Sequence, residues 1–276
     1  MTVDSQLLLP FAGFTALHFA TANALIKAGI PPSKVHIIAE KLPSTVNALT
    51  VSTLGLWVLF VKKNYQHSWI TAEYPKLLDT IFAIHGGFTA YDLIVMLSSK
   101  ETSHISSWLH HVFGIAGVVA TRALKKGAYY PACFMPTEVT VVSSNLLYLV
   151  QKFSPDSHEL ITAIMVFRCI LFTVFRLPAG PWCLYHAINT VPLVENGEKE
   201  TKKEDSVFNR VKKRLTAFVH HFSELPLIVK AGVICNVSLF AGLNTYWTFL
   251  TYRALWRQLA LSKRKKLTSA GNIHHI

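Results

Sequence analysis

Long apolar segments separated by short polar breaks dominate the pattern of hydrophobic positions along the chain. An α-helix needs about 20 mainly apolar residues to cross a bilayer, and seven segments approach or exceed that length. They are 7–26, 42–61, 77–97, 104–124, 128–150, 158–193 and 225–250. The pattern therefore predicts an all-α, polytopic membrane protein with about seven transmembrane helices.

The polar stretches between these segments predict the remaining organisation. We expect residues 27–41 to be a linker broken at Pro31-Pro32, and Pro178 and Pro181 to bend the sixth helix. Residues 195–214 are polar and charged, which predicts a flexible loop. The tail at 263–276 is basic, and we expect it to be disordered at the membrane surface. The expected domains are 1–41, 42–262 and 263–276.

Composition supports the membrane class and excludes others. The 276 residues are 51% hydrophobic, with a formal charge of +12 and a mean hydropathy of +0.35. The basic residues cluster between and after the apolar segments, so we expect membrane lipids as partners and no nucleic acid. The four cysteines are scattered without a paired spacing, which predicts no metal site. Basic residues are nearly balanced between the two sets of loops, so charge does not orient the chain.

Ionisable and strongly polar residues interrupt the third, fourth and fifth apolar segments. A charge at the bilayer centre costs about 2.5–3.5 kcal/mol on insertion scales, so such residues normally face a bundle interior and mark function. They are His85, Asp92, His110, His111, Glu138 and Asn145. A purely structural role, in which they hold helices together, remains the alternative for each, and for Glu138 with Asn145 above all.

Helical spacing predicts that several of these side chains meet. His85 and Asp92 are seven residues apart, close to two full turns, and so share one stripe of their helix. His110 shares a face with Gly114 and Gly117, small residues that let membrane helices approach closely. We therefore expect His110 to be the more buried of the pair and His111, about 100° round the helix, to be freer.

A carboxylate beside an imidazole fixes its tautomer, the usual preparation of a general base. Asp92 lies at almost the depth of His110 across a short turn, so we expect it to bind one imidazole of the pair. Arg168 and Arg176 on the sixth segment are candidate counter-charges to the acids. Arg176 could equally extend to the membrane interface.

At these residues the sequence resembles the TLC-domain family, the membrane group that includes the ceramide synthases. The likeness covers roughly residues 40–262. It rests on Gly87-Phe88 with Tyr91-Asp92, Leu109-His110-His111-Val112 with Gly114-Ile115, Pro136-Thr137-Glu138-Val139-Thr140 with Asn145, Phe175-Arg176-Leu177-Pro178, and Asn244-Thr245-Tyr246-Trp247. Residues 42–262 are accordingly expected to form the TLC domain.

The resemblance implies six helices in a barrel around an intramembrane cavity, one further helix, and a cytosolic C-terminus. In ceramide synthases the histidine pair is catalytic in acyl transfer from acyl-coenzyme A to a sphingoid amine, which carries over to His110 and His111. The synthases also have an aspartate motif after the pair, whereas this chain has Thr137-Glu138-Val139-Thr140. That version resembles the small, non-synthase TLC-domain proteins linked to membrane lipid composition.

The leading hypothesis is a protein of membrane lipid homeostasis, in the endoplasmic reticulum or plasma membrane. The alternative is an acyl-CoA-dependent N-acyltransferase, with acyl-CoA as co-substrate and no resident cofactor. The candidate catalytic residues are His110, His111 and Asp92, and the candidate substrate-binding residues are Glu138, Asn145, His85 and Arg176. A homo-oligomer is allowed. A di-iron desaturase needs several close histidine clusters, which this sequence lacks. A b-type cytochrome needs histidine pairs that face one another across helices, and His18, His85, His110 and His186 are the candidates for such pairs. No receptor motif is visible.

Overall fold

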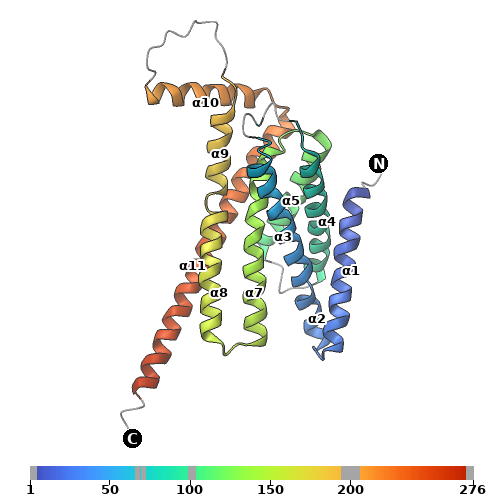
Figure 1. The fold of residues 1–276 in the computed structure, drawn as a ribbon, viewed down its shortest axis with the longest axis vertical. Helices are drawn as coiled ribbons and strands as arrows, with labels where there is room; N and C mark the ends of the chain where they lie inside the picture. Colours follow the sequence, from blue (N-terminus) through green and yellow to red (C-terminus); the bar gives the residue numbers. More distant parts are fainter. Residues whose placement is uncertain (1–4, 66–68, 70–72, 99–103, 194–205, 272–276) are drawn as a thin grey trace.

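The computed structural model describes residues 5–65, 69, 73–98, 104–193 and 206–271, with side chains as far as Lys263. All regular structure in these ranges is helical, which confirms the predicted class (Figure 1). The longer α-helices are α1 (Ser5–Lys27), α3 (Lys41–Leu56), α4 (Lys76–Ser98), α5 (Ile105–Leu124), α7 (Val139–Phe153), α8 (His158–Leu171), α9 (Ala179–Thr190), α10 (Val207–Ser223) and α11 (Leu227–Gly271). The shorter elements are α2 (Pro32–Ala39), α6 (Tyr129–Phe134), the 3-10 turn η3 (Met135–Glu138), and the π-helical turns η1 (Trp57–Val61) and η4 (Phe172–Arg176).

Six helices form a closed ring. Going round it, α3 contacts α4, α4 contacts α5, α5 contacts α11, α11 contacts α8, α8 contacts α7, and α7 returns to α3. The remaining long apolar helix, α1, packs outside the ring against α4. This arrangement agrees with the expected barrel of six helices with one further helix.

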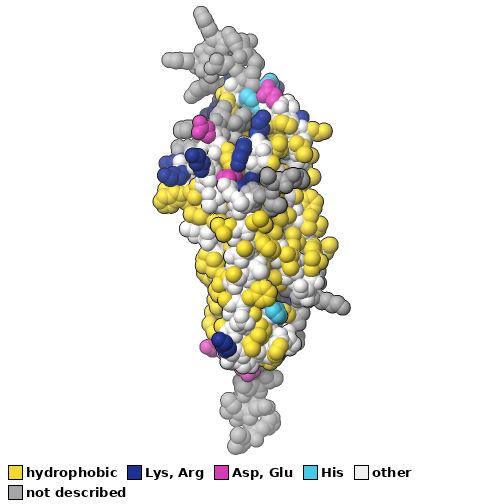
Figure 2. Space-filling view, turned by 90° about the vertical axis from the view of Figure 1, so that its right-hand side faces the viewer, with side chains coloured by type: hydrophobic (Ala, Val, Ile, Leu, Met, Phe, Trp, Pro, Cys, Tyr) yellow, Lys and Arg dark blue, Asp and Glu magenta, His cyan; other side chains and the backbone are white. Residues whose placement is uncertain are grey.

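The surface is that of a membrane protein. Within the described residues, six helices are long and apolar enough to cross a bilayer. The ring member α5 is not among the six; it is 20 residues long but carries His110, His111 and Arg122. Figure 2 shows hydrophobic side chains covering the middle of one face and charged side chains towards its ends. Helix α1 begins towards one end of the bundle and α11 ends beyond the other (Figure 1), as seven crossings would require if α5 is counted with the six.

Two adjacent glycines bring α1 against α4. A Cβ atom added to Gly86 would lie 2.8 Å from Cδ2 of Leu7, and one added to Gly87 would lie 2.8 Å from the Leu7 carbonyl oxygen and from the Phe11 nitrogen. Such distances are far inside van der Waals contact. The two helices can therefore pack this closely only because Gly86 and Gly87 have no side chains.

The structure corrects three predictions about the polar segments. The predicted linker at 27–41 contains the short helix α2, whose preceding residue is Pro31. The predicted loop at 195–214 is wrong from Val207 onward, because these residues begin α10; residues 195–205 lie outside the described residues. The predicted disorder of the tail is wrong for residues 263–271, because α11 continues as far as Gly271; residues 272–276 lie outside the described residues.

Helix α10 is amphipathic, so its many polar residues reflect one exposed face of a helix and not the predicted loop. Its apolar residues recur at helical spacing, and Val211, Leu215 and Val219 are exposed along one stripe. On the same side Phe218 packs against Trp69, with ring centroids 6.2 Å apart. The helix lies across the end of the bundle rather than along it (Figure 1).

The prolines of the sixth apolar segment interrupt it as expected. Helix α8 ends at Leu171, the turn η4 follows, and α9 begins after Pro178. A proline removes a backbone donor and clashes with the preceding turn, so the helix cannot continue unchanged through it. The π-helical turn is the local consequence, and it carries Arg176. All four cysteines are free, and Cys235 is exposed while the other three are buried.

Candidate functional site

An aspartate–histidine pair joins two neighbouring helices of the ring. Nε2 of His111 on α5 lies 2.9 Å from Oδ2 of Asp92 on α4, and both side chains are largely buried, with 14% and 12% exposed. The nitrogen donates its proton to the carboxylate, which leaves Nδ1 of His111 as the ring atom with a free lone pair. The predicted contact between Asp92 and one imidazole of the pair is therefore confirmed, and the imidazole is that of His111.

The neighbouring His110 has a different environment. Its ring packs edge-on against Phe240 and Trp247 of α11, with centroids 5.1 and 5.3 Å away. Its Nε2 lies 3.8 Å from Oε1 of Glu138, and its Nδ1 is buried without a hydrogen-bond partner among the described residues. A buried imidazole nitrogen without a partner is unfavourable unless a ligand or water satisfies it.

The two imidazoles are equally exposed, which contradicts the prediction that His110 would be the more buried. Each side chain is 14% exposed. The glycine stripe does face a neighbouring helix, because a Cβ atom on Gly117 would lie 2.9 Å from Oδ1 of Asn236 on α11. The flank that carries His111 is covered as well, since α4 packs on that side and supplies Asp92. The histidines thus differ in their partners rather than in burial.

Glu138 and Arg176 complete the site from the opposite side of the ring. Glu138 ends the turn η3, and it is buried and interacts electrostatically with Arg176, His111 and His85. Arg176 is 5% exposed, so it does not extend to the interface. Its Nε donates to Oγ1 of Thr140 at 2.6 Å, which fixes the guanidinium among the acids and histidines.

Helix α11 holds the same arginine from its other side. Nη1 of Arg176 donates to Oδ1 of Asn244 at 3.1 Å, and its guanidinium lies 4.8 Å from the centre of the Trp247 ring. Cation–π contact and two hydrogen bonds together compensate the cost of burying this charge. Arg168, the other predicted counter-charge, lies over the Phe172 ring at 5.1 Å.

His85 lies deeper on the stripe of Asp92. Its Nδ1 is 3.3 Å from Nδ2 of Asn47 on α3, and its charge would interact with those of Glu138 and His111. Both side chains are buried. Asn47 was missed by the sequence analysis. Its seven-residue spacing from Glu40 could have indicated it, because residues seven apart lie on the same face of a helix.

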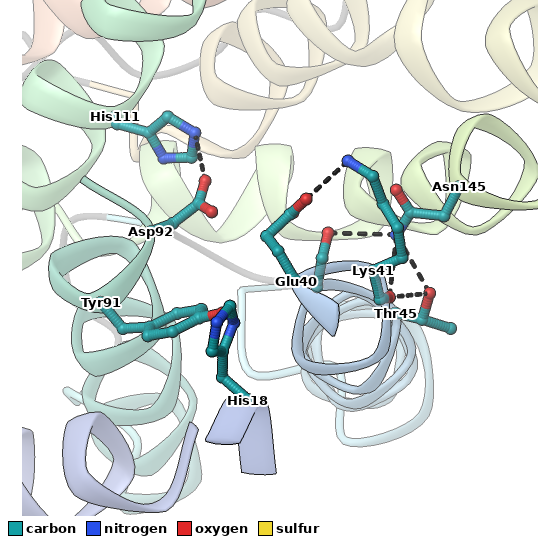
Figure 3. A network of polar contacts seen from close by, with 9 residues as sticks. His18, Glu40, Lys41, Thr45, Tyr91, Asp92, His111 and Asn145 are labelled. Atoms are coloured by element: carbon teal, nitrogen blue, oxygen red, sulfur yellow. Dashed lines mark hydrogen bonds and ion pairs between the residues drawn. The ribbon is translucent and has the colours of Figure 1, made fainter. Parts of the chain in front are cut away.

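Glu40 was also missed, because it falls in the segment predicted to be a linker. It is buried, forms an ion pair with Lys41 at 2.5 Å, and interacts electrostatically with Asp92 and His111. Figure 3 shows its carboxyl group between Asp92 and Lys41. The site therefore contains a third acid on the third wall of the ring.

Asn145 does not join this group. Its Nδ2 donates to hydroxyl oxygens of Ser44 and Thr45 at 3.1 and 3.0 Å, and lies 3.3 Å from the carbonyl oxygen of Lys41. These bonds tie α7 to α3 (Figure 3). The geometry of Asn145 is that of a helix contact, whereas the other six predicted site residues lie together.

A second polar chain reaches towards the site from outside the ring. Nδ1 of His18 on α1 is 2.7 Å from the hydroxyl of Tyr91, the residue before Asp92, and its Nε2 is 3.0 Å from Nδ1 of His36 on α2. His186 instead stacks on Tyr129 at 5.4 Å. The histidines considered for a haem therefore have separate partners.

Among the described residues, the group that could hold a metal ion lies outside the ring, at the end of α10. It comprises His220, His221 and Glu224, whose ligand atoms all lie within 4.8 Å of one another. The site instead offers a base oriented by a carboxylate, a second imidazole, two more acids and a buried guanidinium. That combination can remove a proton and stabilise a developing negative charge.

These features define a class: an all-α membrane protein with a histidine pair inside a ring of six helices. The sequence model of the TLC domain matches residues 38–253. The chain belongs to the TLC-domain family. It is similar to TLC domain-containing protein 4-B of Danio rerio, with 23% identity over 198 residues, covering 67% of this chain and 74% of that protein. No solved structure matches it.

Proposed function

We propose that this protein acts on membrane lipids at the ring site and so influences the phospholipid or sphingolipid composition of its membrane, in the endoplasmic reticulum or plasma membrane. The observation that carries the proposal is the pair of Asp92 and His111 inside a ring of membrane helices. Ionisable residues are costly there and persist mainly where they serve a site. A lipid headgroup entering the ring would meet the free Nδ1 atoms of both histidines.

The residues have distinct roles in this proposal. Asp92 orients His111 and stabilises its protonated form, so His111 is the general base. Arg176 stabilises negative charge that develops on the substrate, and Thr140 and Asn244 position it. His110 and Glu138 bind the polar part of the lipid. Asn145, which bonds to α3, supports the wall of the ring rather than the substrate.

Lipid mass spectrometry of membranes with and without this protein tests the proposal. The comparison is repeated with His110→Ala and His111→Ala, each expressed and located normally. We expect a lipid class to change with the intact protein and to return to baseline with either variant. An unchanged lipid profile with the intact protein would remove the proposed function.

A second candidate is acyl transfer from acyl-coenzyme A to a lipid amine, favoured by the free Nδ1 of the Asp92-bound imidazole. His111 would take a proton from the amine as its nitrogen attacks the thioester carbonyl. The carbon–nitrogen bond forms, the carbon–sulfur bond breaks, and the thiolate leaves with the proton returned by His111. Purified protein incubated with acyl-coenzyme A and a long-chain amine should then release one thiol for each amide formed; lipid changes without thiol release would exclude this candidate.

A further inference from the structure

Two adjacent histidines and an acid converge at the end of α10, outside the ring. His220 and His221 lie in the last turn of the helix, and Glu224 follows it directly. Oε1 of Glu224 is 3.5 Å from Nδ1 of His220, and its Oε2 is 3.4 Å from Nδ1 of His221. One carboxylate therefore faces two imidazole nitrogens at once.

The spacing of these atoms suits a metal ion better than two ion pairs. A charge-assisted hydrogen bond from an imidazolium to a carboxylate is about 2.7–2.9 Å long, and both separations exceed this. Zinc bonds to histidine nitrogen and carboxylate oxygen are about 2.0–2.2 Å, so neighbouring ligands in a tetrahedral site lie about 3.3–3.5 Å apart. The two observed separations match that distance.

His221 is oriented as a metal ligand. Its Nε2 lies 3.2 Å from the carbonyl oxygen of Pro192. A carbonyl oxygen only accepts, so Nε2 carries the proton, and in the neutral ring the lone pair is on Nδ1, the atom that faces Glu224. Metal-binding histidines usually donate their other ring N–H to a carbonyl or carboxylate oxygen in this way.

The surroundings of the three side chains also favour a cation. Those of His220 and Glu224 are 51% and 60% exposed, so an ion can reach them from water and both can adjust to it. The carbonyl groups of the last turn of a helix carry partial negative charge, which attracts cations. Imidazole ligands select transition metals, whereas Mg²⁺ and Ca²⁺ prefer oxygen ligands.

We propose that His220, His221 and Glu224 bind a divalent transition-metal ion, zinc being the best match to the distances. The ion fixes His221 and so holds the end of α10 against the residues that follow α9, where Arg214 already donates to the carbonyl oxygen of Val191 at 3.0 Å. This site is separate from the ring and does not rest on the proposed function. The prediction of no metal site considered the cysteines alone, and none of them is a ligand here.

A zinc titration of the full chain in detergent, purified with a tag that contains no histidine, tests the proposal. Bound zinc is counted per chain by elemental mass spectrometry after equilibrium dialysis. We expect Glu224→Gln and the double variant His220→Ala/His221→Ala to weaken binding at one site at least about 100-fold, since loss of a partner outside the ligand shell alone costs about 10–100-fold. Zinc should also slow amide hydrogen exchange at the end of α10, in the intact chain only.

The double variant His274→Ala/His275→Ala is the matched control, because it removes another adjacent histidine pair, outside the described residues. It should keep the zinc site, and so should His111→Ala in the ring. Unchanged zinc affinity in Glu224→Gln, with or without a lower thermal midpoint of the zinc-free chain, would leave only ion pairs and overturn the proposal. Equal losses in the tail variant, or displacement of the zinc by equimolar Mg²⁺, would overturn it as well.

Discussion

His111 is bound to Asp92 at 2.9 Å, whereas its neighbour His110 is 3.8 Å from the nearest acid, Glu138. The two histidines are adjacent on one helix and equally exposed, so only their direction distinguishes them. A rotation of about 100° between successive residues points His111 towards α4 and His110 towards α11. One imidazole is thereby prepared as a base, and the other is packed among aromatic rings with an unsatisfied nitrogen.

Replacing either member of the bonded pair should remove the effect on lipids without removing the protein. Asn in Asp92→Asn keeps the shape but loses the charge that orients the imidazole and stabilises its protonated form. General-base catalysis contributes about 10²–10⁴-fold, so we expect a loss of at least roughly 100-fold in both Asp92→Asn and His111→Ala. The measurement is the change in lipid composition per molecule of folded protein.

His220→Ala, an exposed histidine of α10, is the control for this pair and should behave as the intact chain. If the pair only holds helices together, any loss of lipid effect will follow a loss of abundance or thermal stability. Well-expressed and fully active Asp92→Asn and His111→Ala variants would contradict the catalytic role.

Asn145→Ala should act on stability and leave the chemistry intact. The amide bonds to Ser44 and Thr45, and the variant leaves their hydroxyl groups without this partner. A typical net loss is about 0.5–1.5 kcal/mol per hydrogen bond. Thermal unfolding in detergent should show a lower midpoint, while the lipid effect per folded molecule stays near that of the intact chain. A lost lipid effect at unchanged stability would return Asn145 to the substrate site.

Gly87→Ala should weaken the contact between α1 and α4. The added methyl group would lie 2.8 Å from backbone atoms of Leu7 and Phe11, which cannot move without shifting α1. Overpacking of this kind costs about 1–3 kcal/mol. Gly13→Ala is the matched control on α1, because a Cβ atom there meets nothing within 4 Å. The control should be neutral or slightly stabilised, since Ala is the better helix former by up to about 1 kcal/mol.

The ends of the bundle should face opposite sides of the membrane. Helix α10 lies at the end opposite the C-terminus (Figure 1), and the family resemblance implies a cytosolic C-terminus. In sealed vesicles, a cysteine introduced at Thr216 of α10 and one added at the C-terminus should react with a membrane-impermeant reagent from opposite sides. Cys235 is exposed and is replaced first. Labelling of both from one side would exclude this topology.

The membrane class and most helix positions followed from the sequence because they depend on local properties. A segment of about 20 apolar residues must form its backbone hydrogen bonds internally in lipid, so length and composition suffice to place it as a helix. The contact of Asp92 with the histidine pair was predictable for a related reason. Residues near a short turn between antiparallel helices have their depth set by the helical rise, and their polarity requires them to face inward.

Local properties misled where the environment of a segment decides its structure. Polar residues at 207–214 predicted a loop, but an amphipathic helix with a packed Phe218 forms there. The linker prediction at 27–41 hid Glu40, whose burial depends on α3 entering the ring beside α4 and α7. In both cases the residues that pack against the segment come from other parts of the chain, so the sequence of the segment alone does not reveal them.

The sequence by itself determined that polar side chains would meet inside a bundle of membrane helices, since lipid offers them no partners. Only the tertiary structure decided which partners they find. Asn145 bonds to α3, and Arg176 donates to Thr140 and Asn244. Asp92 binds His111 rather than His110. These choices depend on helix rotations and distances of a few ångströms, which arise from the packing of all six ring helices at once and from no single segment.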